Sequence, residues 1–381
     1  MIDLIFPTDG LAISLLTPVQ REFNMRQQRG EFDCEEFSDG PDYGGGVFSW
    51  IFNKYKQNFN WQHVTNPNEI TLSAPHYIKF SWRADIPCNI EISRSADFLE
   101  VQQDEHALFD VDYIYECDGV VTACLGNFLM NTEYFWRVVS KDGTQVSSVR
   151  SFRTLDEFPR CIYAQGTANV RDMGGARTYD GKRIRQGRLY RGGALESISQ
   201  RQYDLTPRGK RALTDVIGIR SEVDLRDEAV GVLSESVLGK SINYKLFPVH
   251  AYSSFFSPEC VNTIGRLIEF VADENNYPIY FHCLAGADRT GTLAYVIQML
   301  LNVKAEYIIW DYTFTSLSLF DIRARTLDNI FIRSFVKEDE LALDDRTKVG
   351  IAAKRIEEFL ADRCGVKPET IQRLKDNLLE D

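Results

Sequence analysis

The sequence predicts two domains, an all-β sandwich followed by an α/β domain whose central sheet is flanked by helices. Before residue 155, apolar and polar residues alternate with a period of two in several short segments, as in half-buried strands. After residue 160, short apolar strands alternate with helical segments, which is typical of an α/β domain. A length of 381 residues fits two or three domains. We therefore expect a first domain over 1–155 and a second over 156–381.

The composition excludes several classes of protein. Apolar residues make up 44% and charged residues 26%, as in a folded globular chain rather than a disordered one. A net charge of -12 makes nucleic acid a poor partner, and no apolar run is long enough to predict a transmembrane segment. The first residues carry no secretory pattern, so we expect a cytoplasmic protein with reduced thiols. The eight cysteines form no close pair, and we expect neither a metal site nor a cofactor.

Short strands fill the first half of the chain. The segments with the clearest alternation are 77–83, 89–93 and 133–138. The last of them leads to Asp142-Gly143, a strong hairpin signal, and the chain then returns as a strand toward Phe152. Several short strands joined by turns favour a β-sandwich.

Part of this half resembles a fibronectin type III-like domain. The resemblance is carried by Phe80-Ser81-Trp82, by the Tyr134-x-Trp136-x-Val138 strand and by Ser151-Phe152-Arg153-Thr154. Residues 20–63 then form an insertion, helical around Gln20–Arg29. Aromatic residues between Phe48 and Trp61 cover the sandwich core or form a surface for a sugar or peptide, and core packing is the preferred interpretation. A partner or glycan at this domain stays an alternative to a structural role.

The second half alternates strands and helices. The expected strands are 189–191, 219–225, 244–249 and 279–283. Thr206-Pro207 opens a helix to about residue 217, and Ser257-Pro258 opens another through residue 271, because each pair places a capping hydroxyl before a proline. Amphipathic helices over 346–360 and 368–379 end the chain. This order predicts a central sheet covered by helices.

One segment of the second half carries the chemistry. Residues 278–292 read Pro-Ile-Tyr-Phe-His-Cys-Leu-Ala-Gly-Ala-Asp-Arg-Thr-Gly-Thr, with a strand before Cys283 and a helix that begins near Thr290 and runs to Leu301. A short loop that enters a helix points backbone N–H groups inward, and these groups form an anion site with the helix dipole. Such a site binds phosphate and favours a thiolate over a thiol. Cys283 is therefore the candidate nucleophile.

The other residues of this segment have matching roles. Arg289 closes the loop and binds two phosphate oxygens with its planar guanidinium. The phosphate-binding loop consists of Leu284, Ala285, Gly286, Ala287, Asp288 and Arg289. Thr290 has a hydroxyl that donates to the sulfur, and His282 is expected to fix the loop rather than to act as a base. For the general acid, Asp288 inside the loop and Asp224 at a strand end both stay open.

This loop resembles the signature of the bacterial tyrosine-phosphatase-like family, which includes dual-specificity and lipid phosphatases. Further motifs of that family are matched in order by residues 169–175 (Asn-Val-Arg-Asp-Met-Gly-Gly), 187–192 (Gly-Arg-Leu-Tyr-Arg-Gly) and 224–226 (Asp-Leu-Arg). The resemblance spans most of 160–381 and implies a cysteine-phosphatase fold with a phosphocysteine intermediate and no metal. It implies Cys283 as nucleophile and Arg289 as phosphate binder, and it supports Asp288 as general acid.

The resemblance also gives roles to residues outside the loop. It implies that Asn169, Arg171 and Asp172 brace the loop or shape the rim of the active site. Many members of the family carry Lys where this chain has Ala287. The missing cation favours phosphotyrosine, with phosphoserine and phosphothreonine as further substrates, over highly charged lipid headgroups.

Three functions stay open on the sequence. The leading hypothesis is a protein tyrosine phosphatase, with dual specificity as an extension, that acts on a phosphorylated protein. The second is a phosphatase for phosphoinositides or other small phosphomonoesters. The third is a binding module whose phosphatase domain is weak or inactive, although the intact set of Cys283, Asp288 and Arg289 argues against it.

Overall fold

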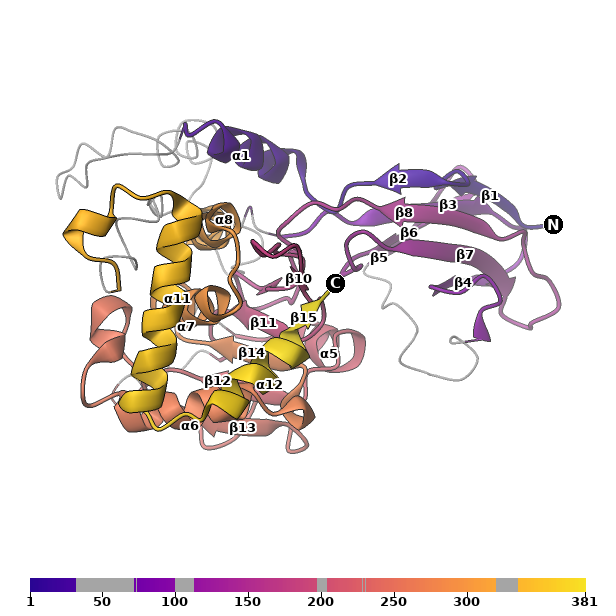
Figure 1. Ribbon diagram of the computed structural model, residues 1–381. Coiled ribbons are helices and arrows are strands. Elements are labelled where there is room, and N and C mark those ends of the chain that lie inside the picture. The colour runs from indigo at the N-terminus through magenta and orange to yellow at the C-terminus, as the bar shows by residue number, and fades with distance from the viewer. Residues whose placement is uncertain are drawn as a thin grey trace, which may run out of the picture.

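The computed structural model describes residues 1–31, 72, 74–99, 113–196, 204–227, 229, 231–319 and 335–381. The Gly-rich segment 39–46 and the aromatic residues between Phe48 and Trp61 lie outside the described residues. In Figure 1 the strands of the first half lie at one end of the molecule, and the helices and sheet of the second half lie at the other.

The strands of the first half form two four-stranded sheets. One sheet has the order β1 (Asp3–Phe6), β3 (Ile78–Arg83), β6 (Val120–Leu125), β5 (Tyr113–Cys117). The other has the order β2 (Leu11–Ile13), β8 (Arg150–Thr154), β7 (Glu133–Ser140), β4 (Cys88–Ser93). One hydrophobic core takes side chains from both sheets, and in it the ring of Phe80 lies 5.3 Å from Trp136 and 5.4 Å from Phe152. The likeness to a fibronectin type III domain stays a prediction.

Helix α1 (Pro18–Gln28) follows β2 and lies against the second half (Figure 1). The Thr17 hydroxyl accepts a hydrogen bond from the Gln20 amide, and the Gln20 side chain accepts one from the Thr17 amide. These two reciprocal bonds form a capping box at the N-terminus of the helix. The buried ring of Phe23 contacts Phe314 of the second half edge-on, with centroids 5.6 Å apart. The helix therefore joins the two halves of the chain.

The second half is built on a five-stranded sheet. Its order is β13 (Asn243–Leu246), β12 (Ser221–Asp224), β14 (Ile279–His282), β11 (Leu189–Gly192), β9 (Arg171–Asp172). All neighbouring pairs are parallel except β9 with β11. In this register Asp224 and Gly192 both lie beside His282, so three parallel strands end at the same edge of the sheet. A small separate sheet pairs β10 (Arg183–Ile184) with β15 (Leu379–Glu380).

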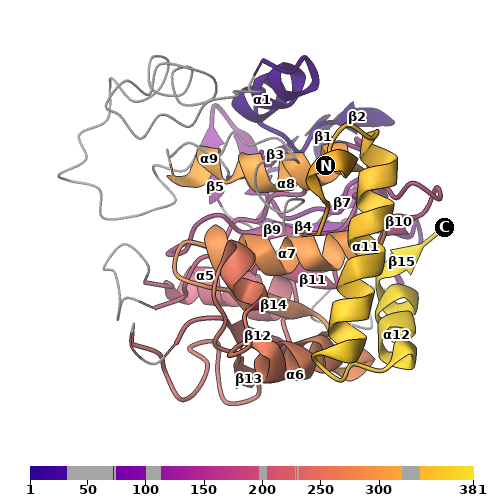
Figure 2. The same cartoon turned by 60° about the vertical axis from the view of Figure 1, so that its left-hand side comes forward.

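Helices cover this sheet and fill the C-terminal part of the chain (Figure 2). They are α5 (Pro207–Arg211), which continues as a π-helical turn (Ala212–Val216), η6 (Tyr252–Phe256), α6 (Val261–Val271), η7 (Glu274–Asn276), α7 (Asp288–Leu300), α8 (Ala305–Phe314), α9 (Ser316–Leu319), η9 (Glu338–Glu340), α11 (Asp345–Asp362) and α12 (Pro368–Leu378). Among the described helices, none combines the length and the hydropathy needed to cross a membrane.

Two helix starts differ from the sequence prediction. The helix expected at Ser257-Pro258 begins at Val261, because the backbone at Ser257 is extended and its carbonyl accepts the Cys260 amide in a separate turn. Helix α7 begins at Asp288 rather than near Thr290, so the loop that precedes it is shorter than expected.

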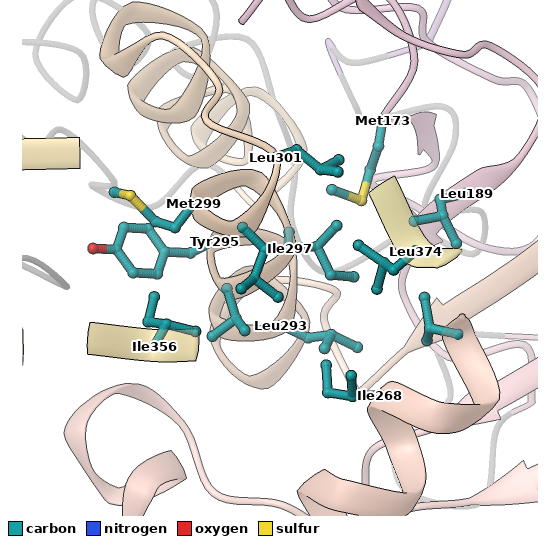
Figure 3. Close-up of a cluster of buried hydrophobic side chains, with 14 of the residues drawn as sticks. Met173, Leu189, Ile268, Leu293, Tyr295, Ile297, Met299, Leu301, Ile356 and Leu374 are labelled. Carbon is teal, nitrogen blue, oxygen red and sulfur yellow. The ribbon is translucent and has the colours of Figure 1, made fainter. Parts of the chain in front are cut away.

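Helix α7 lies at the centre of the second half. Its residues are buried continuously from Thr290 to Leu300. Figure 3 shows Leu293 and Ile297 of this helix among Ile268 of α6 and Leu374 of α12. A helix that is buried all round has little freedom to shift. The loop at its start is therefore held on a rigid support.

A second link between the halves is made by Arg160. Its Nε donates to the Phe128 carbonyl at 2.8 Å and its Nη2 to the Asn127 carbonyl at 2.7 Å. Its Nη1 pairs with the Asp172 carboxylate at 2.7 Å. A cavity of about 450 Å³ lies between α1 and α8, with Phe158 and Trp310 in its wall.

Candidate active site

Cys283 lies at the point where the central strand of the sheet meets helix α7. Strand β14 ends at His282 and α7 begins at Asp288, so residues 283–287 form the loop between them. Cys283 is 5% exposed, so its thiol is nearly buried where the strand ends. The structure thus brings the predicted loop to the edge where the three parallel strands end.

Gly286 is required by the shape of this loop. Its φ of +68° lies in the left-handed region that side chains disfavour. A Cβ at this position would lie 2.4 Å from the Gly192 backbone, far inside van der Waals contact. The loop therefore packs directly on the chain that leaves β11.

The backbone of the loop offers donors. Among the described residues, no acceptor receives the N–H groups of Leu284, Ala285, Gly286, Ala287 and Arg289. Successive N–H groups of this kind, ahead of a helix N-terminus, form a concave anion site. The structure thus provides the donors that a phosphate group needs.

Arg289 and Thr290 follow the loop in the first turn of α7. The Arg289 side chain is 25% exposed, and its Nη2 lies 3.7 Å from the Asp227 carboxylate. The Thr290 hydroxyl is buried and makes no hydrogen bond to a described residue. Its predicted donation to the sulfur of Cys283 therefore stays a prediction.

Asn169 contacts the loop directly. Its Nδ2 donates to the carbonyl oxygens of Gly286 at 3.0 Å and Ala285 at 3.2 Å. These bonds occupy two carbonyl oxygens of the loop and so help to fix its backbone. Arg171 in turn donates to the Asn169 side chain, so the two residues hold the loop together.

Asp311 of α8 holds two buried arginines behind the loop. Its carboxylate accepts from Arg171 Nε at 2.6 Å and from Arg191 Nη1. Arg191 Nη2 also donates to the Gly286 carbonyl at 3.0 Å. Burial would raise the pKa of Asp311, but the Arg191 and Arg171 charges lower it below its ordinary value. Burial and the nearby Arg171 charge lower the pKa of Arg191 to about 10.

His282 supports the loop from the strand side. Its Nδ1 lies 3.0 Å from the Cys283 carbonyl and its Nε2 lies 3.0 Å from the Glu222 carboxylate. Burial alone would lower the pKa of His282, but the Asp224 and Glu222 charges raise it to about 9. The imidazole is therefore protonated near neutral pH and donates from both nitrogens. Its positive charge lies directly behind Cys283.

Asp224 and Asp288, the two acid candidates, have different surroundings. Asp224 is fully buried, pairs with Arg226 at 2.7 Å and accepts from the Tyr244 hydroxyl at 3.1 Å. Burial would raise its pKa, but the His282 and Arg226 charges lower it below its ordinary value. Asp288 is partly exposed at the start of α7.

Asp172 lies away from the loop. Its carboxylate pairs with Arg160 and accepts from the amides of Gly174 at 2.8 Å and Gly187 at 2.7 Å. Burial raises its pKa. Of the three residues expected to brace the loop, Asn169 and Arg171 are placed at it, whereas Asp172 is placed at the link between the two halves of the chain.

Sequence reasoning missed four residues of this site. Arg191 was part of a recognised motif, but no role was assigned to it. Glu222 alternates with Asp224 on the same strand and so shares its burial, which is a weak signal. Asp311 and Tyr252, whose hydroxyl donates to Asp288 Oδ1, belong to other elements, and no sequence pattern marks them.

Within the described part of the chain, no group of three or more potential metal-ligating side chains is present.

Comparison with known proteins gives three findings. The model of the tyrosine phosphatase family matches residues 162–380, which is more than half of the chain. A curated protein of Cupriavidus necator named "Putative tyrosine-protein phosphatase" is 29% identical over 171 residues, and the match covers 38% of this chain and 59% of that protein. The chain thus spans about three fifths of this relative.

A solved structure also aligns with part of the chain. It is the core catalytic domain of a PP-IP phosphatase from S. cerevisiae in complex with citrate. The identity is 18%, the alignment covers 35% of this chain and 80% of the other, and the TM-score is 0.25. A score of this size does not establish a shared fold.

Proposed function

Because the chain belongs to the tyrosine phosphatase family, we propose that its second half is a cysteine-dependent phosphatase that hydrolyses phosphomonoesters, with phosphotyrosine in proteins as the preferred substrate. One observation carries the proposal: the nearly buried Cys283 begins a loop whose N–H groups have no acceptor among the described residues, and Arg289 follows the loop in the first turn of α7. This arrangement suits a tetrahedral dianion held directly above a thiolate.

In the first step the Cys283 thiolate attacks phosphorus. The S–P bond forms as the P–O bond to the leaving group breaks, and the electron pair of that bond goes to the leaving oxygen. Asp288 gives its proton to this oxygen, so the product leaves as a neutral phenol or alcohol. Arg289 and the loop N–H groups hold the three other phosphate oxygens and bind the charge that develops on them.

In the second step water attacks phosphorus of the phosphocysteine. The water gives a proton to the Asp288 carboxylate as the new P–O bond forms and the P–S bond breaks. The electron pair returns to sulfur, and inorganic phosphate leaves. The protonated His282 behind the loop favours this return, because its positive charge stabilises a nearby thiolate.

Asp288 is proposed as the general acid in preference to Asp224. A general acid has to carry a proton, and the paired, buried Asp224 has a lowered pKa and stays ionised. Asp224 also makes its bonds to Arg226 and Tyr244. Its proposed part is to raise the pKa of His282.

The preference for phosphotyrosine rests on depth and charge. A nearly buried nucleophile such as Cys283 is reached more readily by a long aryl phosphate than by the short phosphoserine side chain. Ala287 is fully buried and adds no cation, and the Asp227 carboxylate beside Arg289 is 42% exposed. A carboxylate at this position repels a second phosphate group, so a monophosphate is favoured over a highly phosphorylated inositol.

The test measures phosphate release in a metal chelator from a phosphotyrosine peptide, the matching phosphoserine peptide and a set of inositol phosphates. The wild type should act fastest on the phosphotyrosine peptide. Cys283→Ser should lower its rate by about 10³-fold or more while still binding vanadate or phosphate. Cys364→Ser, at a partly buried cysteine in the turn between α11 and α12, is the matched control and should keep wild-type activity.

The results separate the alternatives. Faster phosphate release from inositol phosphates than from the phosphotyrosine peptide would contradict the proposed substrate but not the cysteine mechanism. Undiminished release by Cys283→Ser would end the cysteine mechanism itself.

A further inference from the structure

Tyr252 reaches the proposed general acid from outside the catalytic loop. It opens the short helix η6, between β13 and α6, and it lies 36 residues before Asp288 in the sequence. Its hydroxyl donates a hydrogen bond to Asp288 Oδ1. The loop that carries this tyrosine therefore meets the first turn of α7 at the acid.

Tyr312 of α8 continues this contact. Its hydroxyl oxygen lies 3.0 Å from that of Tyr252. Since the Tyr252 proton is donated to Asp288, the geometry leaves Tyr312 as the donor to Tyr252. Burial and the neighbouring Tyr312 keep the pKa of Tyr252 above its ordinary value, so this hydroxyl keeps its proton and acts as a donor.

The backbone at Tyr252 is held in an unusual conformation. Its φ is 56°, a region that few residues other than glycine adopt. The Thr292 hydroxyl fixes it there: this oxygen accepts the Tyr252 amide at 2.9 Å and donates to the Asp288 carbonyl at 2.8 Å. One side chain thus ties the backbones of both partners together. Strained conformations that the surroundings enforce tend to occur where a side chain has to be aimed.

We infer that Tyr252 is a positioning residue, which holds the Asp288 carboxyl in the orientation needed for proton transfer. The inference rests on the proposed function. The carbonyl oxygen of a carboxyl group is its better acceptor, so the Tyr252 bond to Oδ1 favours Oδ2 as the oxygen that carries the transferred proton. After the transfer, the same bond stabilises the carboxylate that takes a proton from water in the second step.

The test uses substrates that differ in their need for an acid. Phenyl phosphate has a strongly basic leaving group that requires a proton, whereas 4-nitrophenyl phosphate has a weakly basic one that requires little help. Tyr252→Phe should lower kcat/KM for phenyl phosphate by about tenfold, the effect of losing one hydrogen bond to a charged group, and should change that for 4-nitrophenyl phosphate much less. A structural defect would lower both rates alike.

Three further variants complete the design. Tyr312→Phe should also lower the rate for phenyl phosphate more than that for 4-nitrophenyl phosphate, but by a smaller factor than Tyr252→Phe. This variant keeps the inference testable if Tyr252→Phe folds poorly. Asp288→Asn should lower the phenyl phosphate rate by about 10²-fold, and Tyr252→Phe should add nothing in that background. Tyr307→Phe, on α8 beside the cavity between the two halves, is the control and should behave as wild type.

The outcomes distinguish this inference from the proposed function. Equal losses on both substrates, or a full additional loss in the Asp288→Asn background, would overturn the role of Tyr252 while the cysteine mechanism stands. A wild type without phosphatase activity, or an active Cys283→Ser variant, would overturn the proposed function and this inference with it.

Discussion

Asp311 connects α8 to the catalytic loop through one carboxylate. The side chain is buried between Arg171 and Arg191, and Arg191 reaches the Gly286 carbonyl. A buried carboxylate paired with two guanidinium groups is hard to replace, because its loss leaves uncompensated charges inside the protein. The shape and charge of the loop therefore depend on a residue of another element, which acts through two arginines.

Asp311→Asn should destabilise the protein by about 3 kcal/mol or more, because both arginines lose their buried counter-charge. It should also lower kcat/KM, since the loop loses its support. Denaturant unfolding and phosphatase assays measure the two effects. Glu306→Gln, at an exposed position on the same helix, should stay within about 0.5 kcal/mol of wild type. Equal stability of the two variants would contradict this account.

His282 makes a contribution that depends on pH. Its pKa is about 9 in the folded protein and about 6.5 in an unfolded chain. The raised pKa adds stability that is fully present below about 6.5 and is lost as the pH rises through about 9. The free-energy gap between wild type and His282→Gln should therefore shrink over this range.

Urea unfolding at a series of pH values checks this prediction. Glu222→Gln removes one carboxylate that raises the pKa of His282, and it should flatten the pH dependence of the wild type in a similar way. A gap between wild type and His282→Gln that stays constant with pH would show that the buried imidazole is not charged.

At the scale of elements, the strand, loop and helix around Cys283 could be predicted from the sequence. The alternating or apolar runs of β3, β7 and β14 and the cap of α5 are local signals, and the structure has elements there. Strands β5, β6 and β9 were not predicted. Strand β9 has only two residues and is defined by its antiparallel pairing with β11. A pairing between distant segments leaves no local pattern in the sequence.

The same contrast holds for the site. Residues 282–290 are adjacent in sequence, so spacing alone placed them together. Asp311 and Tyr252 come from other elements, and only the packing of α8 and η6 against α7 brings them to the loop. The predicted start of α6 was wrong, because Ser257 ends the short helix η6 instead of capping α6.

Gly286 tests whether the loop needs its observed shape. Gly286→Ala places a Cβ 2.4 Å from the Gly192 backbone at a φ of +68°, so the loop has to move. We expect a loss of about 10²-fold or more in kcat/KM. Gly350→Ala, in helix α11 with nothing near the new Cβ, is the matched control and should raise stability by about 0.5–1 kcal/mol with unchanged activity. Full activity in the Gly286 variant would contradict the proposed loop geometry.

At the scale of the whole molecule, the first half touches the second through α1 and through Arg160. Phe23 of α1 meets Phe314 of α8, the helix that also carries Asp311. Arg160 joins carbonyls of the first half to Asp172 of the second. These contacts tie the first half to α8 and to Asp172, whereas its role stays a prediction.

Phe23→Ala should destabilise the full chain by about 3 kcal/mol, because a buried ring between the two halves is replaced by a cavity. Met25→Ala, on the same helix and 49% exposed, should cost about 0.5 kcal/mol or less. Urea unfolding of the full chain compares them. Similar midpoints for both variants would show that α1 adds no stability to the molecule.

The central claim is that phosphate passes through Cys283. Its most direct test is rapid acid quenching of the wild type during turnover of a phosphotyrosine peptide, followed by mass spectrometric mapping of the phosphorylated residue. The account predicts phosphate on the peptide that contains Cys283 and none in Cys283→Ser. Phosphate on another residue, or turnover by Cys283→Ser, would contradict it.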